Sequence, residues 1–294
     1  MTKPFATVAP IDDIDARLAD AESAFADIRP GLAKEIVWAD PLAKTRAALA
    51  VVYIHGFSAS KGEVRPLPDL VAKALGANLF YTRLAGHGRS ADAMAEASVD
   101  AWKNDMEEAL DIATHIGERT LIIATSTGAA LATWALAQPG LTGPVAGAVF
   151  LAPNYKIRRR GAGLLTAPFA RVSARLLLGK RRGFVPLSAL HAAYWMTDYP
   201  VSALLPMADL IKEIRGLPFE KIGTPALFIQ SAKDQVVDPL QTARVARRWG
   251  GPATLVDPGD VGDPYGHVVA GDALSPKTTE AIAKDIRKWF INIQ

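Results

Sequence analysis

The stretch of residues 121–128 constrains the fold of this chain more than any other. It begins with Leu-Ile-Ile, three apolar and partly β-branched residues that predict a buried strand, and it breaks at a run of small residues around Ser126. Residues 129–137 follow, rich in alanine and with Leu131 and Trp134 at a helical spacing. A strand, a sharp turn and a helix, with a serine between small residues, is the pattern of a nucleophile elbow.

The small residues on either side of Ser126 have a steric reason. The turn forces the serine into a strained backbone conformation, and a large side chain at Ala124 or Gly128 would collide with the adjoining strand or helix. The usual pattern has glycine at both positions, so Ala124 departs from it by the smallest possible step. Five residues alone do not separate a nucleophile from a structural turn rich in serine and threonine, so the rest of the chain has to decide.

Apolar runs alternate with helical patterns along most of the chain. The predicted strands are residues 35–39, 47–54, 78–84, 121–123, 145–151, 226–230 and 253–256, and the predicted helices are 11–28, 68–76, 98–113, 129–137, 239–249 and 275–290. Ser98 is expected to cap its helix, and Ser275 does the same with Pro276 at the first helical position. Strands that alternate with helices predict an α/β fold, a mostly parallel twisted sheet flanked by helices.

One segment breaks the alternation. Residues 154–217, called the insert below, hold several short helical patterns separated by glycine and proline and no clear buried strand. We therefore expect a core domain of residues 1–153 and 218–294, with residues 1–34 as an N-terminal helical extension. The insert is expected to form a helical lid, or cap, over the carboxyl ends of the strands, where open α/β sheets bind ligands.

Composition narrows the class of protein. The chain has 294 residues, of which 50% are hydrophobic and 21% charged, as expected for a soluble globular protein with a sizeable core. It has no cysteine, which excludes disulfides and thiolate metal sites. The N-terminus lacks the apolar run of a signal peptide and no stretch approaches membrane-spanning length, so we expect a cytoplasmic protein. A net charge of +3 is too small to indicate nucleic-acid binding.

A serine nucleophile needs a base, an acid that orients the base, and donors for the oxyanion. Of five histidines, His267 is the best candidate for the base, because it lies in a loop between the last strand and the last helix, at the same sheet edge as the elbow. Asp234 follows the strand 226–230 and is expected to be the acid. Its competitor Asp238 precedes Pro239 and fits a helix cap instead. The other histidines are His55, His87, His115 and His191.

Two backbone N–H groups are the expected oxyanion donors. One belongs to Thr127, at the start of the helix after the elbow, and the other to Phe57, after the glycine of the His55-Gly56 turn. His55 itself is expected to fix its loop. Three further carboxylates are expected to shape the histidine loop through turn hydrogen bonds, namely Asp257, Asp260 and Asp263.

These residues carry a resemblance to a known family. The chain looks like an α/β-hydrolase from residue 45 to its end, and it is most similar to the carboxylesterase and monoacylglycerol-lipase-like branch, which includes serine aminopeptidases of the S33 type. The matching residues are His55, Gly56, Phe57, Ser58, Gly86, His87, Gly88, Arg89, Ser90, Trp102, Ser126, Asp234, Gly266 and His267. The chain order of Ser126, Asp234 and His267 is the order expected in this fold.

The resemblance implies a serine hydrolase that cleaves carboxylic esters of small molecules through an acyl-enzyme. Such a reaction needs no metal or organic cofactor. The alternatives are a thioesterase or an amide hydrolase with the same triad, or a non-catalytic binding protein. An aminopeptidase would need a lid carboxylate for the substrate amine, for which Asp209 and Glu213 are conceivable. The resemblance does not indicate the acyl chain, the alcohol or the oligomeric state.

The insert is strongly basic. Between Lys156 and Arg182 it carries nine cationic residues, no acidic residue occurs from there until Asp198, and leucines lie between the cations. One interpretation is a solvated basic face, and the other is peripheral contact with an anionic membrane. Aromatic residues are too sparse for a nucleic-acid groove. Tyr194, Trp195 and Met196 are expected to line an acyl pocket or to pack the lid. The nine are Lys156, Arg158, Arg159, Arg160, Arg171, Arg175, Lys180, Arg181 and Arg182.

Overall fold

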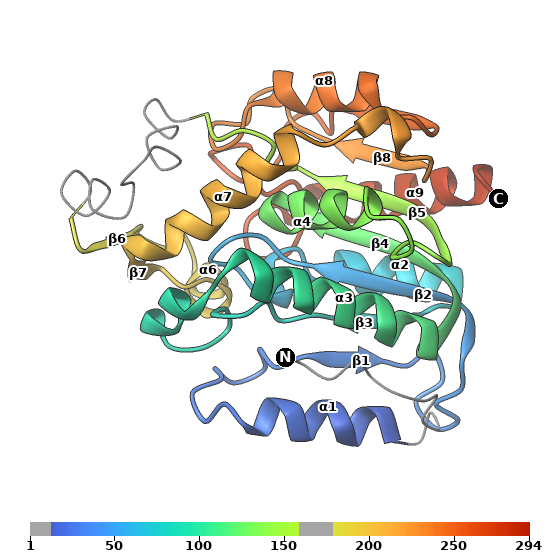
Figure 1. Ribbon diagram of the computed structural model, residues 1–294, viewed down its shortest axis with the longest axis horizontal. Helices are drawn as coiled ribbons and strands as arrows, with labels where there is room; N and C mark the ends of the chain where they lie inside the picture. The colour runs from blue at the N-terminus through green and yellow to red at the C-terminus, as the bar shows by residue number, and fades with distance from the viewer. Residues whose placement is uncertain (1–12, 159–178) are drawn as a thin grey trace.

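The computed structural model describes residues 13–158 and 179–294, and a seven-stranded sheet forms its centre (Figure 1). The strand order is β1-β3-β2-β4-β5-β8-β9. Every neighbouring pair is parallel except β1 and β3, so the predicted mostly parallel sheet is confirmed. The strands are β1 (Glu35–Val37), β2 (Ala47–Ile54), β3 (Asn78–Tyr81), β4 (Gly117–Thr125), β5 (Val145–Leu151), β8 (Ala226–Ile229) and β9 (Ala253–Val256).

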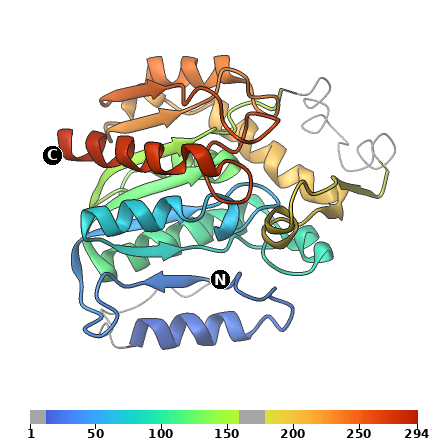
Figure 2. The same cartoon turned by 180° about the vertical axis from the view of Figure 1, so that it is seen from behind.

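Helices cover both faces of the sheet, as Figures 1 and 2 show from opposite sides. One face carries α1 (Ile14–Ser23), α3 (Val99–Ile116), α4 (Ser126–Leu136) and α8 (Pro239–Arg248). The other face carries α2 (Leu67–Leu75) and α9 (Pro276–Asn292).

Alternate residues of a central strand belong to different halves of the core. In β4, Ile122 and Ala124 pack with the helices of the first face, whereas Leu121 and Ile123 pack with α2 and α9. All four side chains are fully buried. A strand covered on both faces has no polar side to show, which is why this segment is a continuous apolar run in the sequence.

Several predicted elements are shorter in the structure. The helix predicted for residues 11–28 ends at Ser23, and Phe25 lies beyond it with its exposed ring 4.8 Å from the guanidinium of Arg83 and 4.6 Å from that of Arg89. The strand predicted for residues 78–84 ends at Tyr81, and the buried Arg83, two residues beyond its end, donates to Glu22 at 2.7 and 2.8 Å. By contrast, Ser98 caps α3 as predicted and accepts from the Ala101 N–H.

The described part of the insert lies beside the carboxyl ends of the strands (Figure 1). It contains the helices α6 (Ala189–Tyr194) and α7 (Leu204–Arg215). It also contains a short antiparallel pair, β6 (Arg181–Gly183) and β7 (Asp198–Pro200), which has no counterpart among the predicted strands. Short 3₁₀ turns occur at η2 (Lys61–Glu63), η3 (Ala91–Glu96), η5 (Val201–Ala203) and η6 (Phe219–Lys221). Among the described helices, none is long and apolar enough to cross a membrane.

Candidate active site

Ser126 occupies the sharp turn between β4 and α4. Its φ of +51° lies in the left-handed region, which a residue other than glycine rarely adopts. A Cβ on Gly128 would lie 2.4 Å from the carbonyl oxygen of His55 and 2.5 Å from that of Ile54. Only glycine therefore fits two positions after the serine. On the other side, Ala124 is fully buried in β4 and is paired with Ile54.

Three loops bring Ser126, Asp234 and His267 together. Nε2 of His267 lies 3.0 Å from Oγ of Ser126, and Nδ1 of His267 lies 2.8 Å from Oδ2 of Asp234. The loops follow β4, β8 and β9, whose carboxyl ends meet at one edge of the sheet. All three side chains are buried, and Asp234 has no exposed surface. The arrangement forms a continuous hydrogen-bonded chain from a carboxylate through an imidazole to a hydroxyl.

The carboxylate of Asp234 is held by hydrogen bonds at both oxygens. Oδ1 accepts from the N–H groups of Val236 and Val237 at 2.7 and 2.9 Å, and Oδ2 accepts from the Gln230 side chain at 3.0 Å. These donors fix the direction in which Oδ2 faces His267. Asp238 instead caps α8 by accepting from the Leu240 N–H at 3.1 Å, which is the structural part predicted for it.

The loop that carries His267 is organised around Asp263. Its Oδ2 accepts from the N–H groups of His267 and Val268 at 2.9 and 2.8 Å, and its Oδ1 accepts from Tyr265 N–H at 3.1 Å. Ser275 completes the loop, because its Oγ accepts from the Asp263 N–H and donates to the carbonyl of Val268. Ser275 is the N-cap residue of α9 and Pro276 its first residue, as predicted, but the Ser275 side chain makes no cap hydrogen bond.

The two other carboxylates predicted to shape this loop do so to different degrees. Asp257 accepts from the N–H groups of Gly259 and Ala232 at 2.9 and 3.3 Å. Among the described residues, the Asp260 side chain pairs only with Lys233, at 3.8 Å and at the surface.

The surroundings of His267 favour its protonated form. Burial alone would lower its pKa, but the charge and hydrogen bond of Asp234 raise the pKa above the ordinary value of 6.5. The charges of Glu63 and Asp263 add to this rise. The site can therefore stabilise an imidazolium, the species that a base becomes after it takes a proton.

Two histidines near the site have structural contacts. Nε2 of His55 accepts from the Leu84 N–H and Nε2 of His87 accepts from the Ser58 N–H, both at 3.1 Å. Their rings are 5.0 Å apart and fully buried. Burial holds the pKa of His55 well below its usual range and lowers that of His87 to about 4, so both rings are neutral. The predicted loop-fixing part of His55 agrees with these contacts.

The two predicted oxyanion donors belong to segments that adjoin Ser126. Thr127 is the second residue of α4, where backbone N–H groups have no intrahelical acceptor and the helix dipole favours negative charge. Phe57 lies in the loop after β2, and no described residue accepts a hydrogen bond from its N–H. This loop passes close to Ser126, because a Cβ placed on Gly56 would lie 3.1 Å from Cβ of Ser126.

A family model described as serine aminopeptidase, S33, matches residues 45–255, which is most of the chain. The chain belongs to the serine aminopeptidase S33 family. Thermostable monoacylglycerol lipase from Bacillus sp. (strain H-257) is 27% identical to it over 204 residues, which cover 68% of this chain and 76% of the lipase.

Two solved structures show the fold of this S33 family member. One, from work on the metagenome-derived lipolytic enzymes LipS and LipT, matches with a TM-score of 0.69 and 19% identity over 90% of this chain and 99% of that one. Monoacylglycerol lipase from Paleococcus ferrophilus matches with a TM-score of 0.63 and 15% identity over 89% and 98% of the two chains. The chain therefore has the α/β-hydrolase fold.

Tyr194, Trp195 and Met196 of the insert make packing contacts. They are the residues predicted to line an acyl pocket or to pack the lid. The Tyr194 ring lies against Gly62, whose Cβ would be 2.2 Å from it, and the Tyr194 carbonyl accepts from Ser60 Oγ at 2.8 Å. Trp195 and Met196 are buried, and the Met196 N–H donates to the Ser58 carbonyl at 2.7 Å. The insert thus contacts residues 58–63, the segment directly after Phe57.

The N-terminal segment secures the same part of the insert. The Arg29 guanidinium donates to the carbonyls of Ala192 and Trp195 at 2.7 and 2.8 Å. Its backbone N–H donates to the carbonyl of Gly88 at 2.8 Å. His191, next to these residues, stacks on Phe184 at 5.1 Å and is a packing residue of the insert.

Some cations of the insert have partners in the structure. Lys156 pairs with Asp238 at 2.8 Å, and Arg181 pairs with Asp92 and with Asp198. The Arg158 guanidinium donates to the carbonyl of Asp234, directly behind the triad. Lys180 is exposed and Arg182 is half-buried. The remaining predicted cations lie outside the described residues, namely Arg159, Arg160, Arg171 and Arg175.

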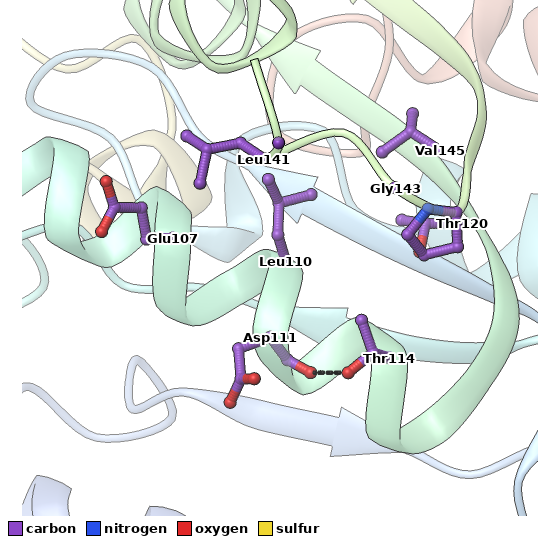
Figure 3. A pocket seen from close by; sticks show the side chains of 10 residues that line it. Glu107, Leu110, Asp111, Thr114, Thr120, Leu141, Gly143 and Val145 are labelled. Atoms are coloured by element: carbon purple, nitrogen blue, oxygen red, sulfur yellow. Dashed lines mark hydrogen bonds between the residues drawn. The ribbon is translucent and has the colours of Figure 1, made fainter. Parts of the chain in front are cut away.

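A cavity of about 240 Å³ lies at the other edge of the sheet (Figure 3). It is lined by Leu110, Asp111 and Thr114 of α3 and by Thr120 and Val145 near the amino ends of β4 and β5. Because the triad lies at the carboxyl ends of these strands, this hollow does not belong to the site. Within residues 13–158 and 179–294, no cluster of side chains could hold a metal ion.

Proposed function

We propose that this S33 hydrolase cleaves carboxylic esters through an acyl-enzyme, with Ser126 as nucleophile, His267 as base and Asp234 as the acid that orients it. The observation that carries the proposal is the buried hydrogen-bonded chain of these three side chains, at 3.0 and 2.8 Å. It costs free energy to bury a carboxylate and to hold a serine in a strained backbone conformation. Catalysis by the triad explains why the chain has both features.

The reaction follows from the geometry. Oγ of Ser126 attacks the ester carbonyl carbon as Nε2 of His267 takes the hydroxyl proton, and Asp234 stabilises the imidazolium. The N–H groups of Phe57 and Thr127 receive the oxyanion, each worth about 3–4 kcal/mol of transition-state stabilisation. The intermediate collapses, and His267 returns the proton to the leaving alcohol. Water then attacks the acyl-enzyme with the same base, and the acid and the free serine are released.

Two features favour esters over peptides. The monoacylglycerol lipase with 27% identity acts on esters by its name. An aminopeptidase needs a carboxylate to hold the substrate amine, whereas Glu213 on α7 pairs with Lys103 at 2.7 Å and Asp209 is exposed. Thioesters and amides remain the second candidate class, because the same triad serves them.

The test measures turnover of p-nitrophenyl esters with two to sixteen carbons in the acyl chain, together with fluorophosphonate labelling. Ser126→Ala, Asp234→Asn and His267→Ala should each lower kcat by about 10³-fold or more with unchanged circular dichroism. Asp238→Asn is the matched control, since Asp238 is a carboxylate on the same loop and should leave turnover within about threefold. Full activity of Ser126→Ala would end the proposal, and an unlabelled, inactive wild type would favour a binding protein.

A further inference from the structure

A second carboxyl group lies beside the triad, and the reaction described above does not use it. Glu63 ends the 3₁₀ turn η2 and is only 2% exposed. A carboxyl taken out of water is costly unless hydrogen bonds replace its hydration. Its contacts therefore indicate what the group does.

One oxygen of Glu63 joins two parts of the site. Oε2 accepts from the Gly56 N–H at 2.7 Å and from the Tyr53 hydroxyl at 3.0 Å. The Tyr53 hydroxyl also lies 3.0 Å from Oγ1 of Thr125, the residue before the nucleophile. The network connects the loop that precedes the Phe57 N–H with the end of the strand that presents Ser126.

The carboxyl also lies close to the nucleophile. A Cβ on Gly56 would be 2.8 Å from Oε1 of Glu63 and 3.1 Å from Cβ of Ser126. The Cα of Gly56 thus faces both side chains, and no larger residue fits at this position. Because Oε2 holds the Gly56 N–H, it fixes the orientation of the chain where it enters the Gly56–Phe57 peptide.

We propose that Glu63 is a positioning residue of this hydrolase: through Gly56 and Tyr53 it sets the oxyanion donor of Phe57 in a fixed relation to Ser126. The inference rests on the proposed function, since it concerns the geometry of the same reaction. If Glu63 only stabilised the fold, its replacement would affect stability first. A positioning residue instead predicts that its replacement lowers kcat while the fold and the substrate affinity are kept.

The charge of Glu63 supplies an independent readout. Burial raises its pKa to about 7, against the hydrogen bond from Gly56, the charge of His267 and the hydrogen bond from Tyr53, which lower it. The cations next to it in sequence face other carboxylates: Lys61 pairs with Glu35 at 2.5 Å, and Arg65 pairs with Glu35 and Asp69. Because the Glu63 carboxylate helps to raise the pKa of His267, its removal should lower that pKa.

The experiment compares two substitutions that separate geometry from charge. In Glu63→Gln the amide oxygen can occupy the place of Oε2 and keep both hydrogen bonds, whereas Glu63→Leu fills the space without an acceptor. Glu35→Gln is the matched control, because Glu35 contacts the same turn from its outer side. Turnover of p-nitrophenyl butyrate is measured from pH 5 to 9, with circular dichroism and thermal unfolding as checks of the fold.

We expect Glu63→Leu to lower kcat about 10- to 100-fold with KM within about twofold, because a displaced oxyanion donor affects the transition state more than the bound ester. Glu63→Gln should keep kcat within about threefold, and the acid limb of its pH profile should move to lower pH. Glu35→Gln should match the wild type in both respects.

Two results would overturn the inference while the proposed function stands. One is a folded Glu63→Leu protein as active as Glu35→Gln, and the other is a Glu63→Gln protein as impaired as Glu63→Leu. If Glu63→Leu does not fold, Tyr53→Phe decides: it removes one bond to Oε2 and the contact with Thr125, and should lower kcat several-fold at constant KM. Wild-type kcat in that variant contradicts the inference. If the wild-type protein neither turns over esters nor is labelled at Ser126, the proposed function is refuted. The inference about Glu63, which rests on it, is then refuted as well.

Discussion

Replacement of Asp263 by alanine should loosen the loop that carries His267. It should impair the triad although Ser126, Asp234 and His267 themselves are unchanged. Three N–H groups lose their acceptor, and two of them, on His267 and Val268, lie in buried residues. An unpaired buried N–H costs about 1–3 kcal/mol, so the free energy of unfolding should fall by roughly 2 to 6 kcal/mol. The third N–H group, on Tyr265, can donate a hydrogen bond to water instead.

The effect on turnover follows from the 3.0 Å contact between Nε2 of His267 and Oγ of Ser126. A displacement of about 1 Å in such a contact can lower the rate by about 100-fold. We therefore expect kcat/KM of Asp263→Ala for p-nitrophenyl butyrate to fall by about that factor. Asp263→Asn keeps one oxygen that can serve both buried N–H groups, and should stay within about tenfold of the wild type.

The matched control is Asp260→Ala. Asp260 lies in the same loop, but its side chain is 93% exposed and makes only a 3.8 Å ion pair with Lys233. Such surface pairs contribute about 0–1 kcal/mol, so neither urea unfolding nor kcat/KM should change measurably. An Asp263→Ala protein as stable and as active as Asp260→Ala would refute the assigned function of the Asp263 carboxylate.

Further predictions concern pH, lipid binding and the N-terminal segment. Because the pKa of His267 is raised above 6.5, turnover should rise with pH through a midpoint above that value and fall as the imidazole is protonated; a maximum near pH 5 would contradict this. If the basic insert meets anionic lipid, co-sedimentation with anionic vesicles should be salt-sensitive and weaker in Lys180→Gln/Arg182→Gln, since each cation near such a surface adds about 1 kcal/mol. Binding that ignores salt and lipid charge would refute it. Arg29→Gln should lower the free energy of unfolding by roughly 2 to 4 kcal/mol in urea titrations, through two lost charge-assisted bonds; an unchanged midpoint argues against that anchor.

Sequence patterns predicted the meeting of Ser126, Asp234 and His267 because topology alone brings them together. Each follows a strand of a parallel sheet, and the carboxyl ends of such strands share one edge. Local chemistry distinguishes Asp238 from Asp234, since an aspartate directly before a proline fits a helix start. Its hydrogen bond to the Leu240 N–H agrees with that reasoning.

Glu63 could not be predicted in the same way. In the sequence it lies in a polar turn between Gly62 and Val64, where a glutamate is ordinarily solvated. Its burial depends on Tyr53 and Gly56, which reach it only in the folded chain. Ser275 differs again: its backbone position before α9 was predicted correctly, but its Oγ binds the histidine loop, because Asp263 N–H and the Val268 carbonyl are the nearer partners.

The steric contacts around the elbow are unequal on its two sides, and this bears on how such hydrolases are found in genomes. After the serine, the carbonyl oxygens of Ile54 and His55 stand 2.5 and 2.4 Å from where a methyl group on residue 128 would be. Before it, the methyl group of Ala124 is accommodated within β4. A search that demands glycine at both ends passes over this chain. A search that requires glycine only after the serine, and admits alanine before it, finds this chain. It still requires the one glycine that the neighbouring carbonyl oxygens make necessary.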